Sequence, residues 1–249
     1  MTTVPIYPDN GPYRPANGTI QKPVLVLGAE GEVGQAMVTT LLETGYPVIA
    51  VARERRELEA LTRPAGNGPE LVRVPGSTDT ETAGAALANA VRLLRRPPGA
   101  VVAMVGGSFT PGRLLDHPAD RLREKFDEDL FPHLIAARHL LPLLGESGAR
   151  GTYLLIGGPA AEAPWAGYGH LSVSSAALRM LARALREETL GGPVRVQQLA
   201  VCAPLRTTEN RQHACPDWPA PDELGRRVVD LLAQSGHEPV VRFDRRRRT

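Results

Sequence analysis

An apolar run that ends in three regularly spaced glycines constrains this chain more than any other feature. The run 23–27 leads directly into Gly28, and Gly31 and Gly34 follow at intervals of three residues. A short apolar run that turns into an amphipathic segment is typical of a buried parallel strand followed by a helix. Apolar residues from Val33 onward fall on one helical face, so the sequence predicts a strand, a tight turn and a helix.

Each of the three glycines has a distinct physical task in this interpretation. Gly28 lets the chain leave the strand in a tight turn, and Gly34 lets the helix pack close to the strand. Gly31 leaves no side chain between the backbone and a pyrophosphate, which would bind the free N–H groups of the helix N-terminus. The alternative is a glycine-rich loop of another α/β protein. The predicted cofactor-binding residues of this turn are Gly28, Glu30, Gly31, Glu32, Val33 and Gly34.

Apolar runs alternate with amphipathic segments along the rest of the chain. The predicted strands cover 24–27, 47–52, 71–74, 100–105, 151–156, 194–201 and 239–241, and the predicted helices cover 31–44, 54–61, 78–95, 118–144, 167–190 and 222–234. This alternation predicts an α/β protein with a doubly wound parallel sheet, a Rossmann fold, in the strand order 3-2-1-4-5-6-7. A chain of 249 residues fits one domain over 23–249, after a proline-rich tail over 1–22.

Composition excludes several classes of function. The net charge of +2 gives little attraction to nucleic acid or membranes, and the arginine run 245–248 is interpreted as a solvated tail. The two cysteines, Cys202 and Cys215, are too few for a disulfide framework and lack metal-ligand spacing with histidines, so no metal site is expected. Neither a signal peptide nor a membrane-spanning run is recognised, and we expect a cytoplasmic protein.

The end of the second predicted strand bears on the choice of cofactor. In dinucleotide-binding sheets an acidic residue there bonds the ribose 2′-hydroxyl of NAD, but this chain has Arg53. A guanidinium suits a 2′-phosphate through charge-assisted bonds, so NADP(H) is favoured over NAD(H). Glu54 is a competing feature that could still serve a 2′-hydroxyl. Loops after the third and fourth strands would complete the cofactor site with Gly76, Val105, Gly106 and Gly107.

Four segments together point to a known family. They are the glycine turn 28–34, the Val-Ala-Arg run 51–53, the glycine-ended strand 104–107 and the helical run 175–185. With these segments the chain resembles a short-chain dehydrogenase/reductase over about 23–241. The resemblance implies an oxidoreductase that transfers a hydride between a nicotinamide cofactor and a carbonyl or alcohol.

The catalytic Ser–Tyr–Lys set of that family does not match this chain. Aligning the helical run puts Ser175 at the lysine position and Leu171 at the tyrosine position. The serine position falls at Gly158, and the supporting asparagine falls near Asp129. Neither of the two lysines of the chain lies four residues after a tyrosine. The catalytic residues of the family therefore cannot be carried over, whereas the cofactor residues can.

A proton donor must then lie elsewhere within hydrogen-bond reach of the carbonyl oxygen. Ser108, Tyr168 and His170 are the predicted catalytic residues, and Ser172 lies in the same region. Each has a structural alternative as a turn residue, a helix cap or a packed side chain. A ketone beside a phenol could instead supply its own proton, because its internal hydrogen bond would stabilise the developing alkoxide.

The loop 203–220 bears on the size of the substrate. It is long, rich in proline and apolar residues, and is predicted to cover a bulky, flat substrate, although a stiff surface loop would have the same composition. The predicted substrate-binding residues are Ser108, Gly158, Tyr168 and Trp218. An arginine-rich, lysine-poor composition resembles that of a GC-rich bacterium. With the lost catalytic set, the chain resembles tailoring ketoreductases of aromatic polyketide biosynthesis.

The sequence therefore predicts an NADPH-dependent ketoreductase that acts on a polycyclic aromatic ketone in antibiotic biosynthesis. Two other readings stay open: a non-catalytic NADP(H)-binding regulatory protein, favoured by the missing catalytic set, and a redox-neutral cyclase or dehydratase on the same fold. The family resemblance implies a homodimer through the helices 118–144 and 167–190. A small-molecule substrate is expected as the other partner, with no role for nucleic acid or a membrane.

Overall fold

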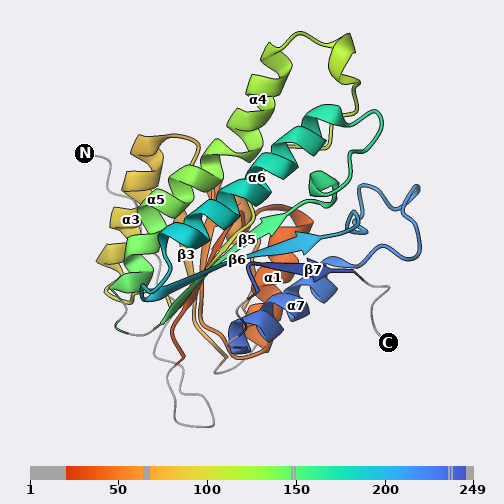
Figure 1. The fold of residues 1–249 in the computed structure, drawn as a ribbon. Helices are drawn as coiled ribbons and strands as arrows, with labels where there is room; N and C mark the ends of the chain where they lie inside the picture. Colours follow the sequence, from red (N-terminus) through yellow and green to blue (C-terminus); the bar gives the residue numbers. More distant parts are fainter. Residues whose placement is uncertain are drawn as a thin grey trace.

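Seven parallel strands form one sheet in the order β3-β2-β1-β4-β5-β6-β7 (Figure 1). This computed structural model describes residues 21–63, 68–146, 148, 150–234, 236 and 238–244, so most of the predicted tail and the arginine run lie outside the described residues. The strand order confirms the predicted Rossmann fold. The strands are β1 (Val24–Leu27), β2 (Val48–Ala52), β3 (Leu71–Pro75), β4 (Ala100–Ala103), β5 (Gly151–Gly157), β6 (Val194–Val201) and β7 (Val240–Phe243).

Helices cover both faces of the sheet, with α3, α5 and α6 on one side and α1 and α7 on the other (Figure 1). The helix α4 extends beyond the sheet on the side of α5 and α6. The helices are α1 (Gly31–Glu43), α2 (Arg55–Glu59), α3 (Glu81–Leu93), α4 (Asp120–Asp129), α5 (Phe131–Gly145), α6 (Gly169–Glu188) and α7 (Pro221–Ala233), with short 3-10 turns at Leu114–Asp116 and Pro159–Ala161.

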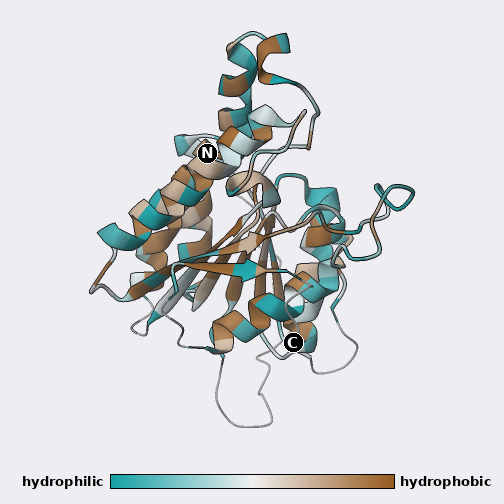
Figure 2. Ribbon diagram, turned by 45° about the vertical axis from the view of Figure 1, so that its right-hand side comes forward, coloured by the Kyte–Doolittle hydropathy of each residue, from teal (hydrophilic) through white to brown (hydrophobic). Residues whose placement is uncertain are grey.

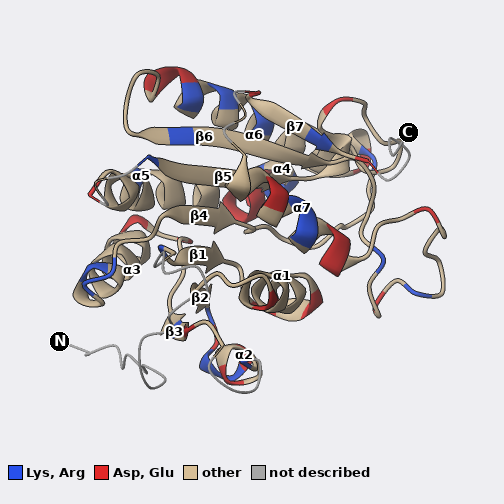
Figure 3. Cartoon of the chain, turned by 90° about the horizontal axis from the view of Figure 1, so that it is seen from below, with Lys and Arg blue, Asp and Glu red and all other residues tan. Residues whose placement is uncertain are grey.

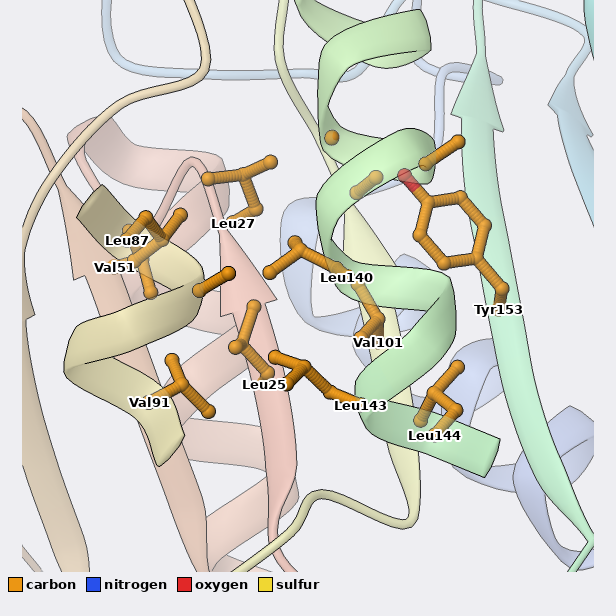
Figure 4. Close-up of a cluster of buried hydrophobic side chains, with 14 of the residues drawn as sticks. Leu25, Leu27, Val51, Leu87, Val91, Val101, Leu140, Leu143, Leu144 and Tyr153 are labelled. Atoms are coloured by element: carbon orange, nitrogen blue, oxygen red, sulfur yellow. The ribbon is translucent and has the colours of Figure 1, made fainter. Parts of the chain in front are cut away.

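The core is divided by the sheet into two apolar clusters. Successive residues of β1 point to opposite faces, so Leu25 belongs to the cluster under α3 and α5, whereas Val26 belongs to the cluster under α1 and α7. Figure 4 shows the first cluster, in which Leu140 and Leu143 of α5 lie over β1. The strands are mostly apolar and the helices carry a polar outer face (Figure 2). Burial of one such large side chain contributes about 1.5–3 kcal/mol.

The long helix predicted over 118–144 is in fact two helices, α4 and α5, separated at Leu130. Pro132 explains the break, because its ring lacks an N–H group and would clash with the carbonyl four residues earlier in a continuous helix. Pro132 instead occupies the first turn of α5, where proline is tolerated. The break places Asp129 as the last residue of α4, beside the loop that follows β4.

The helix predicted from 78 begins later, at Glu81. Thr80 caps it, because its Oγ1 atom accepts a hydrogen bond of 3.1 Å from the N–H of Ala83. Thr78 is instead buried in the loop after β3. Among the described helices, none has both the length and the apolar character needed to cross a membrane.

Candidate active site

The glycine turn after β1 has the geometry that its sequence predicts. Gly28 has a φ of +86°, and a Cβ atom there would lie 2.1 Å from the carbonyl oxygen of Met104. A Cβ atom on Gly34 would lie 2.4 Å from the carbonyl oxygen of Gly28, so α1 packs too closely for any side chain. Gly31 also has a positive φ, of +69°, but a Cβ atom there would meet nothing within 4 Å. The middle glycine therefore borders open space, as a phosphate cradle requires.

A cleft of about 580 Å³ opens beside this turn, at the carboxyl ends of the strands. Thr78 Oγ1 and Glu30 Oε2, which belong to residues of its lining, are buried and have no hydrogen-bond partner among the described residues, which suits a polar ligand. Gly31 and Glu32 do not line the cleft. The predicted cofactor residues that line it are Gly28, Glu30, Val33, Gly34, Arg53, Gly76, Val105, Gly106 and Gly107.

Arg53 lies at the mouth of this cleft, with 62% of its side chain exposed. Its Nε atom lies 3.4 Å from Glu30 Oε1, which also lines the cleft. The neighbouring α2 carries both basic and acidic residues (Figure 3). The Arg53 guanidinium is therefore available to bind an anionic group of a ligand, with the Glu30 carboxylate next to it.

A second cleft of about 670 Å³ adjoins the first. One side of α6 lines it with Leu171, Ser174, Ser175 and Leu178, whose spacing places them on one helical face. The first half of the loop 203–220 forms the opposite side, through Ala203, Pro204, Leu205, Thr207, Glu209 and Asn210. The segment 104–108 lines both clefts and is called the shared wall below.

Three buried or half-buried side chains hold the shared wall. The ring of His133 donates a hydrogen bond of 2.9 Å from Nε2 to the carbonyl oxygen of Val105. Burial lowers the pKa of His133 to about 4, so the ring stays neutral. Asp129 accepts a bond of 2.9 Å from the N–H of Gly107, and Lys125 donates one of 3.0 Å to the carbonyl oxygen of Ser108. The wall is thus fixed from α4 and α5.

Lys125 is a functional candidate that the sequence analysis missed. It is only 2% exposed, and its Nζ atom also donates to Asp129 Oδ1 at 2.9 Å and to Glu128 Oε2 at 3.1 Å. The Oδ2 atom of Asp129 accepts a bond of 2.7 Å from the Ser174 hydroxyl. Asp129 itself lines the second cleft with 13% of its side chain exposed. An ammonium and a carboxylate are therefore paired at the edge of the second cleft.

The predicted residues Tyr168, His170 and Trp218 do not line either cleft. Tyr168 precedes the first turn of α6, and its ring packs edge-on against Trp165 with the centroids 6.2 Å apart. His170 is buried against the ring of His117 at 5.5 Å, and this burial lowers its pKa. The Ser172 hydroxyl caps backbone groups near the start of α6. Tyr168, His170 and Ser172 thus make the packing and capping contacts that were the alternatives to catalysis.

Ser108 and Gly158 do lie where the sequence predicts them. Ser108 is exposed and lines both clefts, and its hydroxyl lies 3.3 Å from that of Thr110. Gly158 lines the second cleft, and a Cβ atom there would lie 3.6 Å from Ser175 Oγ. Gly158 and Ser175, which align with the serine and the lysine of the family, therefore lie next to each other, but neither carries the side chain that the family has at its position.

The loop 203–220 is fastened to the glycine turn. The backbone N–H and the hydroxyl of Thr208 both donate to Glu32 Oε2, at 2.7 and 2.6 Å. These two bonds lower the pKa of Glu32, which keeps the carboxylate charged. The loop is thereby held over the second cleft by the first turn of α1, and Glu32 serves this contact rather than lining the first cleft.

Comparison with known proteins identifies the family. A model of the short chain dehydrogenases matches residues 22–217. The chain belongs to this family. Members of the short-chain dehydrogenase family are oxidoreductases that depend on NAD(P)H, and the glycine turn, with the unpartnered polar atoms beside it, fits such a dinucleotide. No curated protein sequence matches the chain.

Solved structures with the same fold are many. A complex of Pseudomonas aeruginosa RhlG with NADP has 22% identity and a TM-score of 0.77, covering 94% of this chain and 98% of that one. A short-chain dehydrogenase from Burkholderia cenocepacia, in complex with NADP, has 22% identity and a TM-score of 0.75, covering 90% and 88%. An alcohol dehydrogenase from Thermococcus sibiricus, with 5-hydroxy-NADP, has 19% identity and a TM-score of 0.76, covering 90% and 96%.

Proposed function

We propose that the protein is a cytoplasmic, NADPH-dependent ketoreductase that reduces a carbonyl of a polycyclic aromatic polyketide in antibiotic biosynthesis. The observation that carries this proposal is the pair of clefts joined by the shared wall. One cleft suits a dinucleotide, and the other is wide and lined mostly by apolar groups. A ketone in the second cleft would lie against the same residues as the nicotinamide end of the cofactor, which supplies the hydride when bound.

The preference for NADPH rests on Arg53. Its exposed guanidinium at the mouth of the first cleft can form an ion pair with a 2′-phosphate. An uncharged ribose hydroxyl would interact with the guanidinium much more weakly. The nearby Glu30 carboxylate would favour a hydroxyl, so the balance between these two side chains sets the degree of discrimination. NADH is therefore expected to bind more weakly than NADPH, and not to be excluded.

The choice of substrate rests on the second cleft and on the missing catalytic set. The loop 203–220 lines that cleft with Pro204 and Leu205, and Phe109 lines it as well. These apolar side chains suit a flat aromatic ring system. In lacking the Ser–Tyr–Lys set the chain also resembles the angucyclinone ketoreductase of simocyclinone biosynthesis. A phenol beside the ketone of such a substrate could assist the reaction, because its hydrogen bond stabilises the developing alkoxide.

The test is the oxidation of NADPH by purified protein with a panel of angucyclinones, quinones and simple ketones, followed at the absorbance of the reduced nicotinamide. Turnover with polycyclic ketones and not with small aliphatic ketones is the expected result. Product mass should rise by two hydrogens, which separates a reductase from a redox-neutral cyclase or dehydratase. Tight NADPH binding without turnover of any ketone in the panel would contradict the proposal.

A regulatory protein that binds NADP(H) is the second candidate, because Gly158, Leu171 and Ser175 replace the catalytic groups of the family. It predicts cofactor binding without turnover and a partner whose binding depends on cofactor occupancy.

We also propose a homodimer for either function, since α5 and α6 expose large apolar side chains. Sedimentation would measure the oligomeric state. Aspartate substitutions at the exposed apolar residues of these helices should weaken the dimer: Phe131, Leu134, Val173 and Met180.

A further inference from the structure

The second cleft offers very few groups that can exchange a proton. Among the described residues that line it, only Asp129 and Glu209 have ionisable side chains. Glu209 is exposed on the loop 203–220, where it would exchange protons with water. Asp129 is mostly shielded, and it is the one in contact with a buried ammonium group, that of Lys125. A general acid must reach the reacting oxygen, and the cleft lining leaves Asp129 in that position.

We propose that Asp129 is the catalytic residue that delivers the proton to the substrate oxygen, and that Lys125 is the positioning residue that supplies this proton through it. The inference rests on the proposed reductase function. It replaces the missing acid of α6 with a pair on α4, of which Asp129 lines the second cleft and Lys125 lies buried behind it. No residue of the pair occupies the tyrosine or lysine position of the family.

The contacts around the pair define a path for one proton. As hydride adds to the carbonyl carbon, the π electrons of the C=O bond move onto the oxygen. The ammonium of Lys125 passes a proton to the Asp129 carboxylate, whose Oδ1 atom lies 2.9 Å from Nζ, and Asp129 passes a proton on to the oxygen, so that the O–H bond forms while Lys125 becomes a neutral amine and Asp129 is again a carboxylate. Lys125 regains a proton through Glu128, which lies 3.1 Å from Nζ and is 40% exposed to solvent. One hydride and one proton from water are thus consumed for each alcohol formed.

The charges of the cluster suit this role. The ammonium of Lys125 offsets the charge of Asp129, the carboxylate that lines the cleft, while the second carboxylate on this ammonium, that of Glu128, is 40% exposed to solvent, which screens its charge. The N–H of Gly107 and the hydroxyl of Ser174 orient the carboxylate from the wall and from α6. Such fixed geometry is what a proton donor needs, because a free carboxylate would turn away from the reacting atom.

The test compares Asp129→Asn with wild type in steady-state and binding measurements. Asparagine keeps an acceptor for Lys125 and Gly107, while its amide can donate to the Ser174 hydroxyl, so the fold should be retained. We expect kcat to fall by about 10²–10⁴-fold, the usual contribution of a general acid, with KM for the ketone and Kd for NADPH unchanged. Asp120→Asn, at the exposed start of the same helix, is the matched control and should keep the wild-type kcat.

Two substitutions and an NMR signal test the role of Lys125. Lys125→Met should lower kcat as Asp129→Asn does. Lys125→Arg should lower it as well although the positive charge remains, because a guanidinium does not release a proton near neutral pH, and a wild-type kcat in Lys125→Arg would show that Lys125 supplies charge and not the proton. Since the chain has only two lysines, lysine labelled with ¹³C gives two side-chain signals, and the one lost in Lys125→Arg is assigned directly. That signal should move in Asp129→Asn without any cofactor or ketone present, while the signal of Lys22 stays.

Several outcomes would overturn the inference and leave the reductase proposal standing. A wild-type kcat in Asp129→Asn would mean that the substrate supplies its own proton. A loss of kcat in Glu209→Gln, with a wild-type kcat in Asp129→Asn, would assign the proton to the loop 203–220. Failure of Asp129→Asn to bind NADPH, or an early melting transition, would show a structural role only. Absence of turnover in the wild type, with NADPH bound, would instead refute the proposed function itself.

Discussion

Replacing Gly34 with alanine tests how closely α1 packs against the glycine turn. The new methyl group would lie 2.4 to 2.7 Å from backbone atoms of Gly28 and Ala29, none of which can rotate away. Overpacking of this kind costs up to about 3 kcal/mol, and the better helix propensity of alanine returns about 1 kcal/mol. We therefore expect Gly34→Ala to lower the free energy of unfolding by about 2 kcal/mol, or roughly 4–8 °C in Tm for a chain of this size.

Gly31→Ala is the matched substitution in the same turn. Its methyl group meets nothing within 4 Å, so the main cost to stability is the positive φ, about 1 kcal/mol. Its effect should appear in binding, because the methyl group enters the space expected to hold the pyrophosphate, and Kd for NADPH should rise by about tenfold or more. Thermal melting and fluorescence titration measure both quantities. An unchanged Tm in Gly34→Ala, or an unchanged Kd in Gly31→Ala, would refute the tasks assigned to these glycines.

Other substitutions separate the remaining roles. Arg53→Gln should raise Kd for NADPH by about tenfold and leave Kd for NADH unchanged, with Arg56→Gln on α2 as control; equal effects on both cofactors would argue against a 2′-phosphate contact. Acid should destabilise the fold as the pH falls from about 6.5 to 4, by up to about 3 kcal/mol, because His133 stays neutral when folded but gains a proton when unfolded. Urea unfolding across this range checks it, and an equally steep dependence in His133→Gln would exclude the histidine. Tyr168→Phe and His170→Ala should keep the wild-type kcat. A large loss of kcat in either variant would indicate that the substituted residue is the proton donor after all.

The parts of the site that depend on local sequence were predictable. The turn after β1 and the glycines after β4 lie directly next to apolar runs, and parallel strands bring their carboxyl ends to one edge of the sheet. The strand order followed from the alternation of strands and helices together with the usual handedness of the crossovers. The break between α4 and α5 could have been read from Pro132, because a helix seldom continues through proline.

The proposed proton donor Asp129 and its partner Lys125 could not be predicted in the same way, because segments that are distant in sequence decide whether a side chain is buried. Lys125 stands in a run of charged residues that reads as a solvated helix face, yet the carbonyl of Ser108 covers it from the shared wall. His170 is adjacent to Leu171 in sequence, but one residue turns about 100° around a helix, so it faces His117 and not the cleft. The only local signal was the spacing of four between Lys125 and Asp129 in a chain with almost no lysine.

The shared wall has a thermodynamic consequence for the order in which the ligands bind. Any ligand that shifts the segment 104–108 in one cleft changes the binding free energy in the other, because the same backbone lines both. Such coupling is reciprocal, so the factor by which NADPH strengthens ketone binding must equal the factor by which the ketone strengthens NADPH binding. A segment anchored by α4 and α5 has little freedom to move, and the two ligands are therefore expected to bind with nearly independent affinities despite lying side by side.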